Sequence, residues 1–172
     1  MSDLLSIRCR ILSILDGDIE PLQNLFLRCT DYHELEEGES TVDDAAEYLL
    51  KNVPPDTAGE DKIVLGIFDS TGLLVAVCDL LRNYPLPREW WIGLLMIDPN
   101  HRGTGLGSQI IADVIAMAGA ENATALWVAP LEQNPNAQRF WERHGFVEER
   151  RAQTTTRSGR SNNVVVRKKV TK

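Results

Sequence analysis

The feature that most constrains this chain is a glycine-rich turn between an apolar run and a run with helical periodicity. The apolar run, residues 90–97, predicts a buried strand, and residues 109–118 predict a helix. The turn between them consists of Arg102, Gly103, Thr104, Gly105, Leu106, Gly107 and Ser108. Backbone N–H groups in such a turn bind anions, and the positive end of the helix dipole adds to the attraction. Because glycine has no Cβ, a phosphate can approach the backbone closely. The sequence therefore predicts a phosphate-bearing ligand here.

The spacing of the glycines argues against two common phosphate loops. A dinucleotide fingerprint requires G-x-G-x-x-G, whereas Ser108 occupies the place of the third glycine, and no strand–helix–strand unit opens the chain. A Walker loop requires a lysine after the glycines, and none follows. The pattern that remains is R-x-x-G-x-G, formed by Arg102, Gly105 and Gly107. Taken alone, the loop has a second interpretation as a plain turn that joins a strand to a helix.

Length and composition predict one globular domain over residues 1–172. Of the 172 residues, 43% are apolar and 25% are charged, as in ordinary soluble proteins. No apolar run approaches the roughly 20 residues of a membrane span, and the first residues lack a signal-peptide pattern. The three cysteines suit free thiols in a reducing cytosol, and the three histidines lack metal-ligand spacing. We therefore expect a cytoplasmic protein with no metal site and no membrane partner.

Charge is unevenly distributed along the chain. The net charge is −7, but residues 150–172 hold eight Lys or Arg and no acid, so the other 149 residues carry −15. An acidic body argues against nucleic-acid binding. In the basic segment the charges alternate with β-branched residues, which predicts a hairpin through Ser158 and Gly159 that pairs residues 154–156 with residues 164–170.

Apolar periodicity and turn residues predict the remaining elements. Asp18 is the expected N-cap of the first helix, and Thr41 with Asp44 resembles a capping box that opens the second. The acidic residues 31–39 are expected to form a connection between these helices. The other predicted strands are residues 6–12, 62–68, 73–81 and 125–129, and a further helix begins after Asn134 and ends at Gly145.

Two motifs carry a resemblance to a known family. The first is Leu95-Met96-Ile97-Asp98-Pro99-x-x-Arg102-x-x-Gly105-x-Gly107, and the second is Asn134-x-x-Ala137-x-x-Phe140-Trp141-x-x-x-Gly145-Phe146. With the order of predicted elements, they resemble the GNAT superfamily of N-acetyltransferases, most firmly over residues 62–148. The resemblance implies an α/β (α+β) fold, in which a mixed central sheet of about seven strands is flanked by about four helices.

The resemblance also implies acetyl-CoA as cosubstrate. Residues 103–108 would hold the pyrophosphate through backbone N–H groups, and Arg102 would add positive charge. The pantetheine arm is an extended amide chain, which a strand edge binds by adding it as a further strand. Asn134 has two compatible roles, as a helix N-cap and as a partner of the pantetheine arm. Outside the loop, the implied contacts are Leu95, Met96, Ile97, Asn134 and Trp141.

The residues that would move protons depart from the family pattern. In direct attack of an amine on the thioester, a base takes a proton from the ammonium and an acid can protonate the thiolate. Trp141 stands where the family has a tyrosine acid, and an indole N–H is not usefully acidic. The thiolate then leaves unassisted, with water, or with Tyr84 as an alternative acid. Glu89 is the first candidate for the base and Asp79 the second, while a water relay would require neither.

The acceptor is predicted from charge alone. Residues 31–47 hold eight acids and no Lys or Arg, which favours a cationic small-molecule or peptide amine. A solvated helix face is the alternative explanation. The predicted function is acetyl transfer to a primary amine, and the alternative function is an acyl-CoA-binding sensor or interaction domain without turnover. Because dimers are common in the family, the resemblance also implies a homodimer.

Overall fold

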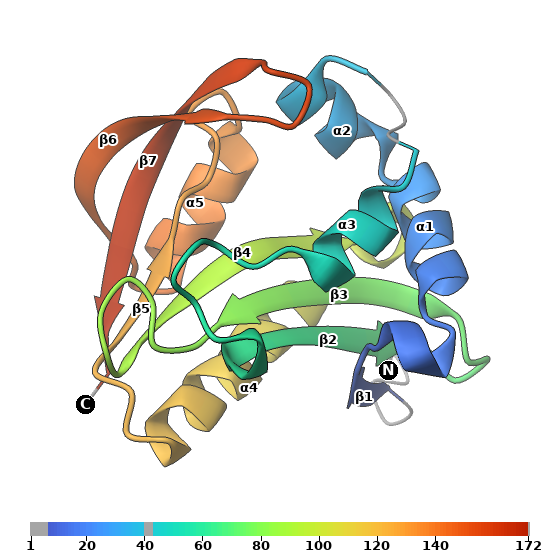
Figure 1. The fold of residues 1–172 in the computed structure, drawn as a ribbon, viewed down its shortest axis with the longest axis horizontal. Coiled ribbons are helices and arrows are strands. Elements are labelled where there is room, and N and C mark those ends of the chain that lie inside the picture. The colour runs from blue at the N-terminus through green and yellow to red at the C-terminus, as the bar shows by residue number, and fades with distance from the viewer. Residues whose placement is uncertain (1–6, 40–42, 172) are drawn as a thin grey trace.

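The computed structural model describes residues 7–39 and 43–171, in which seven strands form one mixed sheet (Figure 1). The strand order is β1-β2-β3-β4-β5-β7-β6. Neighbouring strands are antiparallel except β4 and β5, which are parallel. The strands are β1 (Arg8–Ile11), β2 (Lys62–Phe68), β3 (Leu74–Leu81), β4 (Glu89–Ile97), β5 (Ala125–Val128), β6 (Val147–Thr155) and β7 (Ser161–Val170).

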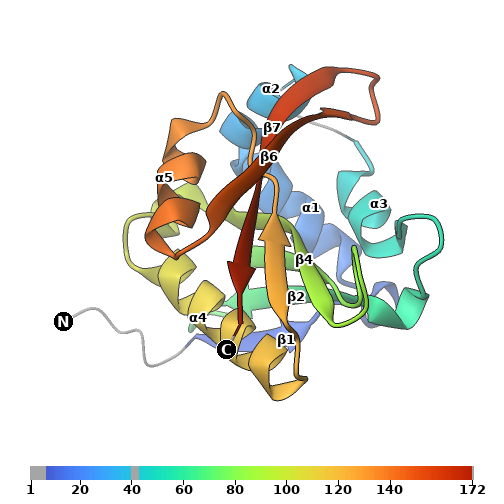
Figure 2. The same cartoon turned by 90° about the vertical axis from the view of Figure 1, so that its left-hand side faces the viewer.

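Helices cover both faces of this sheet, as Figure 2 shows, with α4 and α5 on one side and α1 and α3 on the other. Within the described ranges the α-helices are α1 (Ile19–Arg28), α2 (Thr30–Glu37), α3 (Ala45–Lys51), α4 (Leu106–Ala120) and α5 (Pro135–Arg143). Short 3-10 turns occupy Ile14–Asp16, Gly59–Asp61 and Pro99–His101. No helix in these ranges is both long and apolar enough to cross a membrane.

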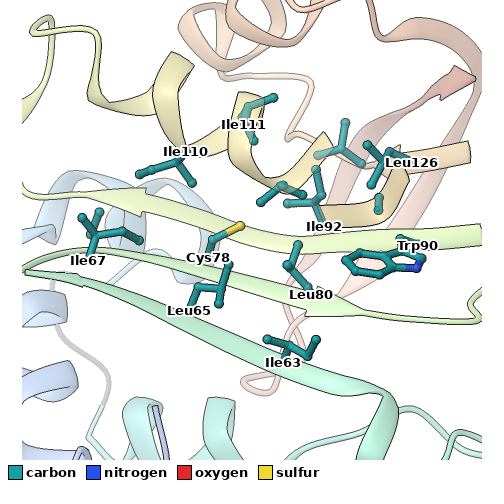
Figure 3. Packing of buried hydrophobic residues seen from close by; sticks show 14 of the residues in the cluster. Ile63, Leu65, Ile67, Cys78, Leu80, Trp90, Ile92, Ile110, Ile111 and Leu126 are labelled. Atoms are coloured by element: carbon teal, nitrogen blue, oxygen red, sulfur yellow. The ribbon is translucent and has the colours of Figure 1, made fainter. Parts of the chain in front are cut away.

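The larger core lies between α4 and the sheet (Figure 3). Strands β2 and β3 are buried along nearly their whole length, because the sheet is covered on both faces. Each fully buried aliphatic side chain contributes about 1.5–3 kcal/mol of transfer free energy. Among the residues that meet in this core are Ile63, Leu65, Ile67, Cys78, Leu80, Trp90, Ile92, Ile110, Ile111 and Leu126.

The predicted acidic connection is wrong, because residues 30–37 form helix α2. Its one buried residue is His33, so the helix has almost no apolar stripe for sequence periodicity to detect. Gly38 ends the helix in the left-handed conformation, with φ of 82° and its N–H on the Glu34 carbonyl. The acids at positions 31, 34, 36 and 37 therefore lie on a helix and not in a loop.

Two expected caps also differ from the structure. Asp18 makes no side-chain cap and instead accepts hydrogen bonds from Arg10, at 2.8 and 2.5 Å, and from the Ser13 N–H. Thr41 of the expected capping box lies outside the described residues, and Asp44 pairs with Arg157 at 2.9 Å. Both carboxylates therefore form ion pairs where the sequence predicted helix caps. Asp18 pairs with Arg10, which is near it in the chain, and Asp44 pairs with the distant Arg157.

Strand β4 has a bulge that sets the shape of the sheet. Its register with β3 shifts where Asp79 pairs with Leu94 and Leu80 pairs with Ile92, which leaves Gly93 as the extra residue. A Cβ on residue 93 would lie 2.6 Å from a carboxylate oxygen of Asp79, so a larger residue here would require the Asp79 side chain to move. Beyond Ile92, β4 pairs with β3 but not with β5, and the two parallel strands separate (Figure 1).

Candidate functional site

The glycine-rich turn has the backbone shape that an anion site requires. Gly103 and Gly105 have φ of 73° and 91°, in the left-handed region that favours glycine, and Gly105 is the N-cap of α4. Apart from the adjacent residues in the chain, no described atom lies within 4 Å of where a Cβ on either glycine would stand. The backbone at the start of α4 therefore faces open space, where a phosphate has room to approach.

The third glycine has a packing role. A Cβ on Gly107 would lie 3.1 Å from Cδ1 of Ile97 and 3.2 Å from Cε2 of Phe140, so this glycine lets β4 and α5 pack closely on α4. Ser108 follows and donates to Nε2 of His144 at 3.0 Å, because Nδ1 of that ring donates to the Phe140 carbonyl at 2.7 Å. The loop is thus tied to α5.

A cavity of about 640 Å³, called here the first cavity, extends from this loop along β4. Strand β4 supplies one wall, α5 supplies another, and α2 supplies Asp31, Tyr32 and Leu35. The predicted cofactor residues that line it are Leu95, Met96, Ile97, Arg102, Gly103, Gly105, Gly107, Ser108, Asn134 and Trp141. Thr104 and Leu106 are not part of the lining: the hydroxyl of Thr104 donates to the His101 carbonyl, and Leu106 is buried in the core.

Arg102 forms an ion pair with Asp31, which the sequence did not predict. Its guanidinium donates to Asp31 of α2 at 2.5 and 3.1 Å and to the Ile97 carbonyl at 2.8 Å. The hydrogen bond from Arg102 lowers the pKa of Asp31. Arg102 therefore clamps the start of α2 to the end of β4, at the rim of the first cavity.

The open edge of β4 faces this cavity. Residues 93–97 have no partner strand on the β5 side, and Leu95, Met96 and Ile97 line the cavity. An unpaired strand edge presents backbone N–H and C=O groups to an extended chain. The structure thus joins the glycine-rich turn to an open strand edge in one continuous space.

A second cavity of about 250 Å³ adjoins the first, and Tyr32 and Met96 line both. Helices α2 and α3, the β4 bulge and the tip of the β6–β7 hairpin surround it. Its other lining residues are Phe26, His33, Glu36, Glu37, Ala45, Tyr48, Leu49, Gly93, Leu94, Thr155, Thr156 and Arg157.

A model of the acetyltransferase (GNAT) family matches residues 19–146 of the chain. The chain belongs to the GNAT acetyltransferase family. No curated protein matches it at a significant level.

Solved structures share the fold of this GNAT acetyltransferase over nearly the whole chain. An acetyltransferase from Thermus thermophilus is 18% identical, with a TM-score of 0.73, covering 97% of this chain and 98% of its own. A GNAT-family acetyltransferase from Staphylococcus aureus is 16% identical, with a TM-score of 0.72, covering 97% and 100%. A chimeric spermidine N-acetyltransferase from Vibrio cholerae is 21% identical, with a TM-score of 0.72, covering 96% of each chain. The predicted GNAT fold is confirmed, with five α-helices in the described ranges where about four were expected.

Two predicted cofactor residues of this GNAT domain have a clear structural role. Asn134 caps α5, because its Oδ1 accepts from the Ala137 N–H at 3.1 Å. Trp141 is buried and packs edge-on against Phe140 and Phe146, with ring centroids 5.1 and 5.0 Å away. Both also line the first cavity, so these roles are compatible with cofactor contacts.

The three residues predicted to move protons do not line either cavity of the described structure. Glu89 is buried at the far end of β4, where it accepts from Trp127 Nε1 at 2.8 Å and from Lys168 Nζ at 3.1 Å. Tyr84 packs edge-on against Trp91 in the β3–β4 loop. Asp79 pairs with Lys62 at 2.9 Å and lies next to Gly93, which itself lines the second cavity. Position therefore supports a structural role for Glu89 and Tyr84, and their catalytic roles remain predictions.

Replacing Glu89 with glutamine separates the two roles. We expect kcat to stay within about twofold of wild type, because Glu89 lies outside both cavities, and the folded state to lose about 1–3 kcal/mol through the weakened contact with Lys168. Steady-state kinetics and urea unfolding measure the two effects. Lys168→Met breaks the same pair from the other side and should give a similar pattern. A fall in kcat of about a hundredfold at unchanged stability would instead identify Glu89 as the base.

Proposed function

We propose that this GNAT acetyltransferase transfers the acetyl group of acetyl-CoA to a primary amine by direct attack on the thioester. The observation that carries the proposal is the first cavity, which joins the anion-binding turn at Gly103 and Gly105 to the open edge of β4. We also infer that residues 1–172 act as one domain, since a single sheet runs from β1 to β7.

The turn and the strand edge suit the two ends of acetyl-CoA. The pyrophosphate is anionic and fits the N–H groups at the start of α4, where it would also compete with Asp31 for Arg102. The pantetheine arm carries two amides and fits the unpaired backbone of residues 95–97. Its thioester end would then lie toward the Gly93 bulge, beside the second cavity.

Acetyl transfer at the thioester would depend mainly on how the amine and the thioester are positioned. A strand N–H near the bulge would donate to the thioester oxygen as negative charge develops there. Holding an amine against the thioester converts a bimolecular reaction into an effectively unimolecular one. Because coenzyme A is a fairly acidic thiol, its thiolate can leave without a tyrosine at position 141.

A cationic acceptor is the class that charge favours. Of the acids on helix α2, Asp31 lines the first cavity, and Glu36 and Glu37 line the second. One structural relative is a spermidine N-acetyltransferase, and spermidine is a cationic amine. Both observations support an amine that is protonated in solution.

Coenzyme A release with a panel of acceptors tests the proposal. We expect background-corrected thiol formation with cationic primary amines and little with neutral or anionic acceptors. Thiol release is followed with a colorimetric thiol reagent, and mass spectrometry identifies the acetylated product. A preference for anionic acceptors, or the absence of transfer to every amine, would contradict the proposed function.

A further inference from the structure

Tyr32 of α2 stands at the junction of the two cavities. It lines both of them, and so does Met96 of β4. A chain laid along β4 from the glycine-rich turn would bring its thioester end to this junction. Of the two shared side chains, that of Tyr32 carries a hydroxyl proton, whereas a thioether has none to donate. Because position 141 holds a tryptophan, the junction is the place to look for another acid.

The other acidic groups of the first cavity are less well placed for this role. Among its described lining residues, the remaining carboxyl, imidazole and hydroxyl groups are those of Asp31, His101 and Ser108. The Asp31 carboxylate is held in an ion pair at the rim. His101 and Ser108 belong to the loop and helix start beyond the C-terminal end of β4, several residues along the chain from the Gly93 bulge. Tyr32 is therefore the candidate acid at the thioester end.

Glu36 connects Tyr32 to the second cavity. It lies one helical turn after Tyr32 on α2, on the same face of the helix, and lines the second cavity but not the first. The Tyr32 hydroxyl donates a hydrogen bond to the Glu36 carboxylate. Glu37 lines the same cavity but accepts from the Ser158 hydroxyl, at 2.5 Å. The Tyr32 hydroxyl thus links the space for the thioester to one carboxylate in the space beside it.

The proton affinities of the two groups suit a relay. Burial raises the pKa of Glu36, the Tyr32 hydroxyl lowers it and Glu37 raises it, with a net rise that makes Glu36 a better proton acceptor. Burial raises the pKa of Tyr32 well above its ordinary value, and the charge and hydrogen bond of Glu36 add to the rise. Once Glu36 has taken a proton, its charge no longer acts on Tyr32, which becomes the stronger acid.

The C-terminal hairpin holds this part of α2 in place. Asn162 of β7 is 4% exposed, donates to the Glu36 carbonyl at 2.8 Å and accepts from the Gln133 side chain at 3.2 Å. Figures 1 and 2 both show the β6–β7 hairpin reaching over to α2. The Tyr32 ring packs edge-on against His33, with the centroids 5.9 Å apart. These contacts fix the two side chains relative to the sheet, as a proton-transfer site requires.

We propose that Tyr32 and Glu36 form a proton relay across the junction. Glu36 takes a proton from the amine on the side of the second cavity, and Tyr32 delivers one to the sulfur on the side of the first. This inference rests on the proposed function and names the residues that move its protons. It assigns that role to α2, whereas the sequence-based candidates Glu89, Asp79 and Tyr84 belong to β3, β4 and the loop between them.

The transfer step balances with these groups. Glu36 takes one proton from the ammonium, and the freed lone pair forms the N–C bond at the thioester carbonyl. The C–S bond then breaks, its electron pair goes to sulfur, and the Tyr32 hydroxyl protonates that sulfur. Glu36 returns its proton to the Tyr32 oxygen, and a second proton leaves the nitrogen for water. The products are an N-acetylated amine, the free thiol and one solvated proton.

Single-turnover thiol release tests the relay, because it measures the chemical step and not product release. With enzyme in excess over acetyl-CoA and saturating cadaverine, a cationic primary amine, we expect Tyr32→Phe and Glu36→Gln each to slow release about a hundredfold. Tyr32→Phe keeps the ring that packs on His33. Calorimetry should find the Kd for acetyl-CoA within about twofold of wild type in both variants, which shows that the fold and the cofactor site persist.

Two other acids of α2 provide matched controls. Glu37→Gln removes the same charge from the same cavity, so we expect a higher KM for cadaverine but a release rate at saturation within about threefold of wild type. Glu34 is exposed and outside both cavities, and Glu34→Gln should leave both quantities unchanged. Equal rates in Glu36→Gln and Glu37→Gln would overturn the relay, and this comparison holds even if Tyr32→Phe fails to fold.

The double variant separates a relay from two independent roles. If Tyr32 and Glu36 act as one unit, Tyr32→Phe with Glu36→Gln should be no slower than the slower single variant. Two independent effects would instead multiply to about 10⁴-fold, which would overturn the relay, as would a Tyr32→Phe rate within about twofold of wild type. Either result leaves the acetyltransferase function intact. Absence of wild-type transfer to cadaverine and to every other amine would overturn the proposed function itself.

Discussion

Replacing Gly105 with alanine is expected to raise the KM for acetyl-CoA at least about tenfold, equivalent to about 1.4 kcal/mol of binding free energy. With φ of 91°, Gly105 is the N-cap of α4, and the position of its missing Cβ is open space. A methyl group there would occupy the approach of the pyrophosphate to the backbone N–H groups. Calorimetry with acetyl-CoA and steady-state kinetics both measure the effect.

Gly72 provides a matched control for this substitution. It also has a left-handed φ, 86°, and open space at its Cβ, but it lies in the β2–β3 turn outside both cavities. Alanine at either position costs about 1–2 kcal/mol of backbone strain, so the two variants should lose similar stability. Only Gly105→Ala should lose affinity for acetyl-CoA. Equal KM values in the two variants would show that the turn does not bind the cofactor.

Replacing Asp98 with asparagine is expected to destabilise the folded state by about 3 kcal/mol at pH 7, because it leaves a buried ion pair without its anion. Asp98 is 1% exposed, accepts from Arg28 Nε at 2.5 Å and caps the turn before the glycine loop through the Asn100 N–H at 2.9 Å. Urea unfolding of the variant and the wild-type protein measures the difference. The exposed hairpin acid Asp69 is the control, and Asp69→Asn should cause a much smaller loss.

The pH dependence of this difference has a definite sign. Burial raises the pKa of Asp98, but the hydrogen bonds from Arg28 and Asn100 outweigh burial, and its pKa lies below the ordinary value. The stabilisation is therefore fully present above the unfolded-state pKa of about 3.9 and is lost as the pH falls through the folded-state pKa. The gap between wild type and Asp98→Asn should narrow below about pH 4. A gap that stays constant to pH 3 would contradict this account.

Several elements that local sequence encodes were predicted correctly, although the side-chain caps expected at Asp18 and Asp44 were not. A left-handed glycine, a helix start and an N-cap depend on a few adjacent residues, which is why the turn at Gly105 and the cap at Asn134 were both found. Strands β2 and β3 were predicted because two short apolar runs separated by turn residues are typical of a β-hairpin. Helix α2 was missed because its acids give no apolar stripe, although Gly38 was a usable signal for its end.

The sequence by itself determined the family fold and the glycine-rich turn at the start of α4, since both depend on short motifs whose backbone shape is local. Only the tertiary structure decided which charged groups meet. It paired Glu89 with Lys168 and Arg102 with Asp31, and it brought Arg157, His33 and Glu36 to one cavity. These partners are far apart in the chain, and a carboxylate has the same local sequence pattern whether it faces a lysine, a cavity or water. The second cavity is therefore a property of how α2, the β4 bulge and the C-terminal hairpin pack together.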